Sequence, residues 1–337
     1  MDGQKLDVFF EVSAMSADKT AVMEPRAGDF GESRLKRLFH ATRPKFFPAS
    51  VLPVVAGTAW GAAQAGGIDV LVALLALVAT MLVHGAGNVL NDVGDETGGS
   101  DRRNTARIYP YTGGSRFIQN RIMSTAEMAR WGIQLLALAG LIGLALIALR
   151  GIGVLWFGLA GIALGVVYSL GPVRLSSLGL GELAVAVAFG VLPVSGAAWL
   201  QTGTLDLPLL VFALPVSAWV AAILLMNEVP DIDADAAVGK ATLPVRFGPT
   251  ATAGIYVGLH LVAAASTLWL TAEGYLPLLA PAVPFVLLAL SLRVAGAVRR
   301  AAADPAGVRG AIEFTLASHT IGCLWATACV LFTIWWS

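Results

Sequence analysis

The sequence predicts an all-α, polytopic membrane protein with nine transmembrane helices. Three observations lead to this fold class. The 337 residues are 57% hydrophobic and only 13% charged, whereas soluble domains carry about 25% charged residues. Nine apolar segments approach the length of about 20 residues that a helix needs to cross a bilayer. The cations are sorted almost completely to one side of these segments, as expected of a membrane protein.

Each expected helix is an apolar run that ends near charged residues, glycine or proline. Helices are the favoured spanning element because their backbone polar groups are satisfied within the segment. The ten-residue alternation of a transmembrane β-barrel is absent. The expected helices cover residues 46–66, 69–91, 126–148, 151–170, 179–201, 207–228, 250–271, 275–293 and 312–336.

The N-terminal residues, the cysteines and the net charge give less information about the fold. Residues 1–33 mix acidic and basic side chains and lack the apolar run of a signal peptide, so we expect a disordered cytosolic tail. Residues 34–337 should form a single transmembrane domain. Cys323 and Cys329 offer neither a disulfide framework nor metal-ligand spacing. Lys plus Arg and Asp plus Glu both number 22, and this zero net charge argues against a nucleic-acid partner.

The positive charges indicate an orientation in the membrane. Apart from Arg150, the Lys and Arg residues lie in the N-terminal region or in and beside the loops that follow even-numbered helices. Cytoplasmic loops are the ones enriched in these residues. We therefore expect the N-terminus and these loops to be cytoplasmic in a cell inner (plasma) membrane. The long loops 92–125 and 229–249 share this side, so the active site is expected there.

An acidic motif, N-V-L-N-D-V-G-D-E, ends the second expected helix. If the helix persists through the motif, Asn88, Asn91 or Asp92, and Asp95 lie at spacings that share one face. A second motif, N-E-V-P-D-I-D-A-D, ends the sixth expected helix. Asn227, Asp231 and Asp235 are expected to share a face in the same way.

Two matched motifs on one side of the membrane predict a shared site. The motifs each close an even-numbered helix, which suggests a pseudo-repeat of two four-helix units. Carboxylates that converge repel one another and need compensating cations. Carboxylate and amide oxygens suit Mg²⁺, which usually also binds waters and substrate phosphates. The pattern therefore predicts Mg²⁺ held between the motifs with a diphosphate completing its coordination.

Besides the two acidic motifs, several short segments are distinctive. With the motifs, they cover residues 43–45 (R-P-K), 88–101, 111–116 (Y-T-G-G-S-R), 168–172 (Y-S-L-G-P), 179–182 (G-L-G-E) and 227–248. Through these segments residues 40–336 resemble the UbiA superfamily of membrane prenyltransferases, whose fold is nine helices around a central cavity. Within it they are most similar to the 1,4-dihydroxy-2-naphthoate polyprenyltransferases of menaquinone biosynthesis. Many other members carry Asp where this chain has Gly99, whereas Asp101 matches the naphthoate branch.

The resemblance implies a role for each matching residue. Asn88 and the catalytic carboxylates Asp92, Asp95, Asp231 and Asp235 would bind Mg²⁺ and diphosphate, with Asn91, Glu96 and Asn227 as second candidates. Expected diphosphate contacts are Lys45, Arg102, Arg116 and Lys240. Glu182, an ionisable residue within an expected helix, is a candidate to position or deprotonate the acceptor, and Tyr168 is a further candidate substrate contact.

The implied reaction is Mg²⁺-dependent transfer of a polyprenyl group from its diphosphate to an aromatic acceptor. For dihydroxynaphthoate the acceptor carboxylate would leave as CO₂, giving demethylmenaquinol. Three alternatives stay open. Another acceptor, such as 4-hydroxybenzoate or homogentisate, is compatible with the same motifs. A transporter would place ionisable groups nearer the middle of the membrane, and a non-catalytic scaffold would not need both acidic motifs.

Overall fold

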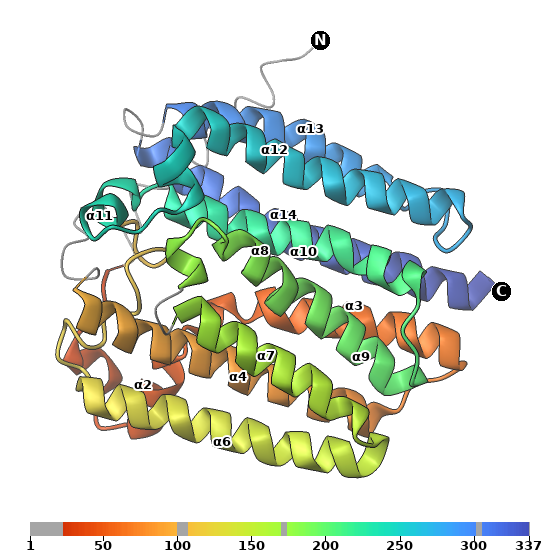
Figure 1. Cartoon of the computed structure of the whole chain (residues 1–337), viewed down its shortest axis with the longest axis horizontal. Helices are drawn as coiled ribbons and strands as arrows, with labels where there is room; N and C mark the ends of the chain where they lie inside the picture. The colour runs from red at the N-terminus through yellow and green to blue at the C-terminus, as the bar shows by residue number, and fades with distance from the viewer. Residues whose placement is uncertain (1–22, 100–106, 170–173, 301–304, 337) are drawn as a thin grey trace.

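The computed structural model describes residues 23–99, 107–169, 174–300 and 305–336, and this part of the chain contains helices and no strands. Long helices run roughly side by side through the molecule (Figure 1). They are α3 (Pro48–Ala65), α4 (Val70–Gly98), α6 (Thr125–Arg150), α7 (Gly153–Ser169), α10 (Leu207–Glu228), α12 (Leu243–Ala272), α13 (Ala282–Arg299) and α14 (Pro305–Trp336), together with one composite helix. The composite helix joins α8 (Gly181–Val185), the π-helical turn η4 (Ala186–Val191) and α9 (Leu192–Thr202).

The predicted fold class is confirmed, whereas the count of nine spans is not. Eight helices in the described residues are long and apolar enough to cross a membrane. The expected helix 151–170 is present as α7, but its apolar stretch, Gly153–Tyr168, is shorter than the other eight. The chain is therefore a multi-pass, all-helical membrane protein.

Several expected boundaries differ because hydropathy and helix formation are separate properties. Two of them have a clear physical reason. The expected helix 69–91 continues to Gly98, where Gly99 ends it with a φ of 77°. The polar residues beyond position 91 therefore remain helical. The expected helix 275–293 begins later, at Ala282 after Pro281, because proline cannot donate the backbone hydrogen bond of a helix interior.

α10 lies at the centre of the bundle and α6 lies at its outside. The apolar stretch of α10 is 78% buried within the protein, against 22% for that of α6. Elsewhere small residues allow close helix crossings, as on α3. A Cβ on Gly57 would lie 2.1 Å from the Val194 carbonyl oxygen of α9. The GxxxG spacing at 57–61 thus marks a packing contact.

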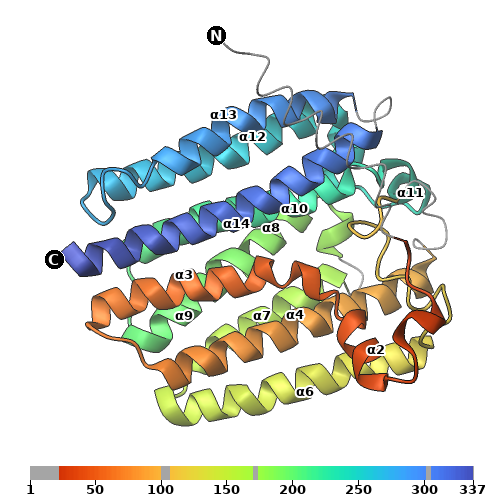
Figure 2. The same cartoon turned by 180° about the vertical axis from the view of Figure 1, so that it is seen from behind.

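The two ends of the bundle contain different elements. α2 (Arg34–Ala41), η3 (Leu175–Ser177) and α11 (Ile232–Ala237) lie at one end, and the C-terminus lies at the other (Figures 1 and 2). At the C-terminal end Arg150 of α6 binds Asp69 at 2.5 Å and donates to the Leu200 carbonyl at 2.7 Å. This contact joins the ends of α4, α6 and α9.

Part of the expected disordered tail is ordered, and the prediction for residues 23–33 is wrong. Ala27–Phe30 forms a short 3-10 helix. The Phe30 ring packs on Phe117 with centroids 5.2 Å apart, and Asn120 Nδ2 donates to the Pro25 carbonyl at 2.8 Å. Charge composition suggested disorder, but these side chains find partners on the loop before α6. Residues 1–22 lie outside the described part of the chain.

Candidate active site

The first acidic motif lies on one unbroken helix, which is the condition under which its residues were expected to share a face. α4 continues through the motif to Gly98, so Asn88, Asp92 and Asp95 share a face. Asp92 is 2% exposed. Its Oδ2 accepts a hydrogen bond from the Ser115 backbone N–H at 3.1 Å, while its buried Oδ1 has no hydrogen-bond partner. The motif therefore presents a fixed carboxylate with one oxygen available.

The amide groups of the two asparagines in this motif donate hydrogen bonds to neighbouring residues. Asn88 Nδ2 donates to the Thr42 carbonyl at 2.9 Å, which ties α4 to the segment before α3. Asn91 Nδ2 donates to Asp95 Oδ2 at 2.8 Å. Asn91 thus orients the Asp95 carboxylate, and Asn88 Nδ2 is occupied by the Thr42 carbonyl.

The second motif lies on a broken helix, and the prediction that Asn227, Asp231 and Asp235 share one helical face is wrong. α10 ends at Glu228, and Asp231 is the N-cap residue of the separate helix α11. Pro230 explains the break, because it lacks an N–H and its ring clashes with the carbonyl four residues earlier. Asp235 lies on α11 and is 8% exposed. The Asn227 Oδ1 atom is buried without a partner.

Lys240 joins the two motifs. Its Nζ lies 3.6 Å from Asp95 Oδ1 and 3.3 Å from Asp235 Oδ1. Burial lowers the pKa of Lys240, but the charges of Asp95 and Asp235 outweigh burial and raise it above the ordinary value. Burial also raises the pKa of the Asp235 carboxyl, against the effect of Lys240. A cavity of about 340 Å³ opens here, lined by Asp95, Arg174 and Lys240 among others.

Three cations hold the loop that precedes the T-G-G-S-R segment. Arg309 Nη2 donates to the Tyr109 carbonyl at 3.1 Å, Lys45 Nζ donates to the Pro110 carbonyl, and Arg43 Nη2 donates to the Tyr111 carbonyl at 3.2 Å. The Lys45 ammonium also lies over the Tyr111 ring, 4.3 Å from its centroid. Lys45, an expected diphosphate contact, is therefore bound to this loop. Arg309 was missed by the sequence reasoning, since its partners are backbone carbonyls.

Arg116, another expected diphosphate contact, is 8% exposed and adopts a positive φ of 65°. Its Nε lies 3.7 Å from Glu24 Oε2, and Arg107 Nη2 lies 2.6 Å from Glu24 Oε1. The N-terminal segment thus places a carboxylate on two arginines of this loop. Arg102 and Asp101 lie outside the described residues.

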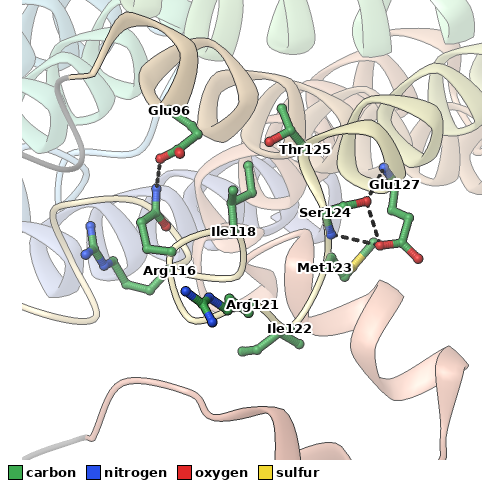
Figure 3. Close-up of a pocket in the computed structure, with 10 residues that line it drawn as sticks. Glu96, Arg116, Ile118, Arg121, Ile122, Met123, Ser124, Thr125 and Glu127 are labelled. Atoms are coloured by element: carbon green, nitrogen blue, oxygen red, sulfur yellow. Dashed lines mark hydrogen bonds between the residues drawn. The ribbon is translucent and has the colours of Figure 1, made fainter.

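Glu96 is separated from its neighbour Asp95. Gln119 Nε2 donates to Glu96 Oε2 at 3.0 Å, and Glu96 lines a different cavity of about 780 Å³ between α4 and the loop before α6. Figure 3 shows Glu96, Arg116, Ser124 and Glu127 around this cavity. Because the cavity contains neither Asp92 nor Asp95 nor any residue of the second motif, it is not the candidate active site despite its size.

Glu182 is brought together with a residue that the sequence reasoning left without a role, Glu228. The side chains are 6% and 9% exposed and interact with each other. Tyr168 on α7 lies near the same acids. Its hydroxyl interacts electrostatically with Glu228, Asp95, Glu182 and Asp235. The signal for Glu228 was its position, as an ionisable residue at the end of an apolar helix.

The donor set suits a magnesium–diphosphate complex better than a metal bound by protein alone. In the described residues no three His, Cys, Asp or Glu side chains gather closely enough to hold an ion. Buried Asp92 Oδ1 and Asn227 Oδ1 nevertheless lack partners, and both are the hard oxygen ligands that Mg²⁺ prefers. Mg²⁺ is commonly held by one or two carboxylates plus substrate phosphates, so the residues present fit that ion.

Comparison with known proteins agrees with this architecture. The 1,4-dihydroxy-2-naphthoate octaprenyltransferases of Haemophilus influenzae and Escherichia coli are 34% and 36% identical to the chain over 228 and 222 residues, in both cases 64% of this chain and 70% of the relative. The human UbiA prenyltransferase domain-containing protein 1 is 31% identical over 215 residues, 62% of this chain and 60% of that protein.

Solved structures have the same fold. A UbiA homologue from Archaeoglobus fulgidus aligns with a TM-score of 0.60 at 16% identity, over 88% of this chain and 99% of that chain. A structure of this homologue bound to GPP and Mg²⁺ aligns with a TM-score of 0.57 at 15% identity, over 87% and 99%. The model of the UbiA prenyltransferase family matches residues 50–319. The resemblance expected from the motifs is confirmed, and the chain belongs to the UbiA prenyltransferase family.

Proposed function

We propose that this prenyltransferase transfers a polyprenyl group from its diphosphate to 1,4-dihydroxy-2-naphthoate, in a Mg²⁺-dependent reaction that releases CO₂ and forms demethylmenaquinol. The observation that carries the proposal is the contact of Lys240 with both Asp95 and Asp235. It brings together the two acidic motifs, whose carboxylates are 140 residues apart here, beside a cavity that Asp95 and Lys240 line. The names of the two bacterial relatives support the acceptor.

The residues divide into three groups by the part of the substrate they would meet. Asp92, Asp95, Asp231, Asp235 and Asn88 would hold the metal and the diphosphate oxygens, with Asn91 and Asn227 beside them. Lys240, Lys45, Arg116 and Arg102 would contact the diphosphate. Tyr168 and Glu182 would lie on the acceptor side.

The reaction separates positive and negative charge, and the groups in the site can stabilise both. The bond from the prenyl carbon to the diphosphate oxygen breaks, and its electron pair leaves with the diphosphate. When bound, Mg²⁺ supplies Lewis-acid stabilisation of the charge on that leaving group. Lys240 adds a positive charge in a partly buried site, where electrostatic stabilisation is strong. The prenyl chain would lie among the apolar helices, which exclude water from the allylic cation.

The acceptor completes the reaction. A ring carbon supplies the electron pair for the new carbon–carbon bond. Where that carbon bears the carboxylate, loss of CO₂ returns an electron pair to the ring and restores its aromaticity. The distribution of cations supports a cytoplasmic position for the N-terminus and the active-site loops.

The central experiment uses membranes that contain the full chain, a polyprenyl diphosphate and dihydroxynaphthoate. We expect prenylated naphthoquinol to form with Mg²⁺ and not with EDTA. Asp92→Ala and Asp231→Ala should each reduce the rate by about 10²- to 10³-fold, since removal of groups that stabilise transition-state charge has effects of this size. Asp206→Ala, at the other end of α10, is the matched control. Full activity in EDTA, or in both motif variants, would contradict the mechanism.

A panel of acceptors separates the substrate from the reaction class. The same membranes are given 4-hydroxybenzoate or homogentisate in place of dihydroxynaphthoate. Turnover of dihydroxynaphthoate alone is the expected result. If prenyl diphosphate is consumed only with another acceptor, the naphthoate assignment is wrong and the prenyltransferase mechanism remains.

A further inference from the structure

Two buried glutamates meet where α8 begins and α10 ends. Glu182 lies in the first turn of α8, and Glu228 is the last residue of α10. Gly181 permits this approach. A Cβ at Gly181 would lie 3.3 Å from Leu224 Cδ2 and 3.8 Å from Glu228 Oε1. The carboxyl groups are thus held in the interior by the crossing of two helices.

The π-helical turn η4 explains how Glu182 is directed toward α10. A π-helical turn contains an additional residue relative to an α-helical turn, and such turns often occur at functional sites. The residues before η4 are therefore rotated about the axis relative to those of α9. η4 itself packs directly on α10, since a Cβ on Gly190 would lie 2.1 Å from Ser217 Oγ.

The glutamate pair has few hydrogen-bond partners. The two carboxyl groups interact with each other and with the Glu182 backbone, but both carboxyl oxygens of Glu182 and Oε2 of Glu228 are buried and receive no hydrogen bond from any other described side chain. Within the described ranges neither residue forms a salt bridge, because Lys240 pairs with Asp95 and Asp235 instead. Buried polar groups nearly always have a partner, and leaving them without one is costly. A ligand that donates hydrogen bonds would remove this cost.

The surroundings restrict the chemical class of that ligand. The neighbouring turns of both helices are apolar and include Phe189, Val220 and Ile223. Tyr168 lies near both glutamates and also near Asp95 and Asp235, so the pair is adjacent to the two acidic motifs. An apolar ring with hydroxyl groups fits this environment.

We propose that Glu182 and Glu228 together bind the hydroxyl groups of a phenolic acceptor and select for acceptors that carry them. The inference rests on the proposed function and adds the group by which the acceptor is recognised. A hydroxyl that donates to a carboxylate gains electron density, which makes its ring a better nucleophile. A site built to bind a substrate hydroxyl also rejects analogues that lack it, because its buried groups then have no partner.

The test compares Glu182→Gln and Glu228→Gln with Glu273→Gln, an exposed residue at the far end of α12. Initial rates are measured for dihydroxynaphthoate and for its two monomethyl ethers, each against varied prenyl diphosphate. We expect either site variant to raise the KM for dihydroxynaphthoate by about tenfold, the scale of a hydrogen bond to a charged group. The preference for the free hydroxyl compound over its ethers should shrink, and the KM for prenyl diphosphate should stay unchanged.

Calorimetry on the purified full chain gives the same comparison without turnover. The wild type should bind dihydroxynaphthoate about tenfold more tightly than either variant, and all proteins should bind prenyl diphosphate with Mg²⁺ equally, which also shows that the variants are folded. The proposal is overturned if acceptor affinity and hydroxyl preference survive both substitutions. It is equally overturned if the variants instead weaken prenyl diphosphate binding. Failure of the proposed function would appear separately, as a wild type that consumes no prenyl diphosphate.

Discussion

The two acidic motifs contain similar residues but are built differently. The first lies on α4, which continues through Asp92 and Asp95 to Gly98. The second is divided between the end of α10, a turn at Pro230 and the short helix α11. A continuous helix fixes its side chains relative to one another, whereas a turn lets a second helix approach from a new direction. Two motifs with the same residue spacing can therefore differ in structure. One lies on a single rigid helix, and the other is divided between two helices that run in different directions.

Of the substitutions that test this difference between the motifs, Pro230→Ala should reduce kcat/KM the most. Alanine restores the backbone N–H and is favoured over proline by about 3 kcal/mol in a helix interior. We expect α10 to extend and to move Asp231 and Asp235 away from Asp95. A displacement of about 1 Å can reduce catalysis by about 10²-fold, so kcat/KM should fall by at least that factor.

Pro208→Ala is the control for the proline experiment. Pro208 lies in the first turn of the same helix, where proline is tolerated because no intrahelical donor is lost. Its activity should stay near that of the wild type. If Pro230→Ala were as active as this control, the turn would have no part in placing the second motif.

Lys240→Met should have an intermediate effect. The substitution leaves Asp95 and Asp235 facing one another without the cation between them. We expect kcat/KM to fall by about tenfold from the loss of one charge-assisted contact to the diphosphate. Because a competing cation is removed, Mg²⁺ titration without substrate should show tighter binding.

Lys240→Arg keeps the charge and should retain most of the activity. The raised pKa of Lys240 means that its contribution is complete below the ordinary value and is lost only as the pH rises through the raised value. The difference between Lys240→Met and the wild type should therefore be constant across neutral pH. A difference that disappeared near pH 7 would contradict the ion pairs.

Asn91→Ala should have the smallest effect. Its hydrogen bond orients the Asp95 carboxylate within a helix that already fixes the backbone. Loss of one such bond has a net effect of about 1 kcal/mol, so the rate should fall by about fivefold. Thr97→Ala is the control, since within the described part of the chain the Thr97 hydroxyl bonds to carbonyls of its own helix alone. A loss comparable with Pro230→Ala would mean that the first motif is less rigid than α4 implies.

The sequence allowed the helices and the first motif to be predicted for clear physical reasons. Apolar length determines a spanning segment, and the spacing of Asn88, Asp92 and Asp95 indicated a shared face if the helix continued toward a glycine such as Gly99. The second motif was predicted less well, because the regular spacing of Asn227, Asp231 and Asp235 was given more weight than Pro230. The proline was the better guide, since its effect on the backbone is local.

Contacts between segments that are distant in the sequence could not be predicted from the periodicity of the residues. The pairing of Glu182 with Glu228 depends on how α8 crosses α10 and on the extra residue of η4. The contact of Glu24 with Arg107 and Arg116 depends on the path of the N-terminal segment. Neither the crossing nor the path leaves a repeating pattern in the chain, and charge composition alone suggested disorder for Glu24.

The position of Lys240 has a further consequence for how tightly this site holds ions. An ammonium group anchored between two carboxylates competes with free cations for those carboxylates. Because it is tethered, its effective local concentration is fixed and does not depend on the ions in solution. A free cation must displace it or share its carboxylates. Without substrate the site is thereby kept from binding cations indiscriminately, and full metal coordination requires the phosphate oxygens that a substrate brings. Metal and substrate are then expected to arrive as one unit.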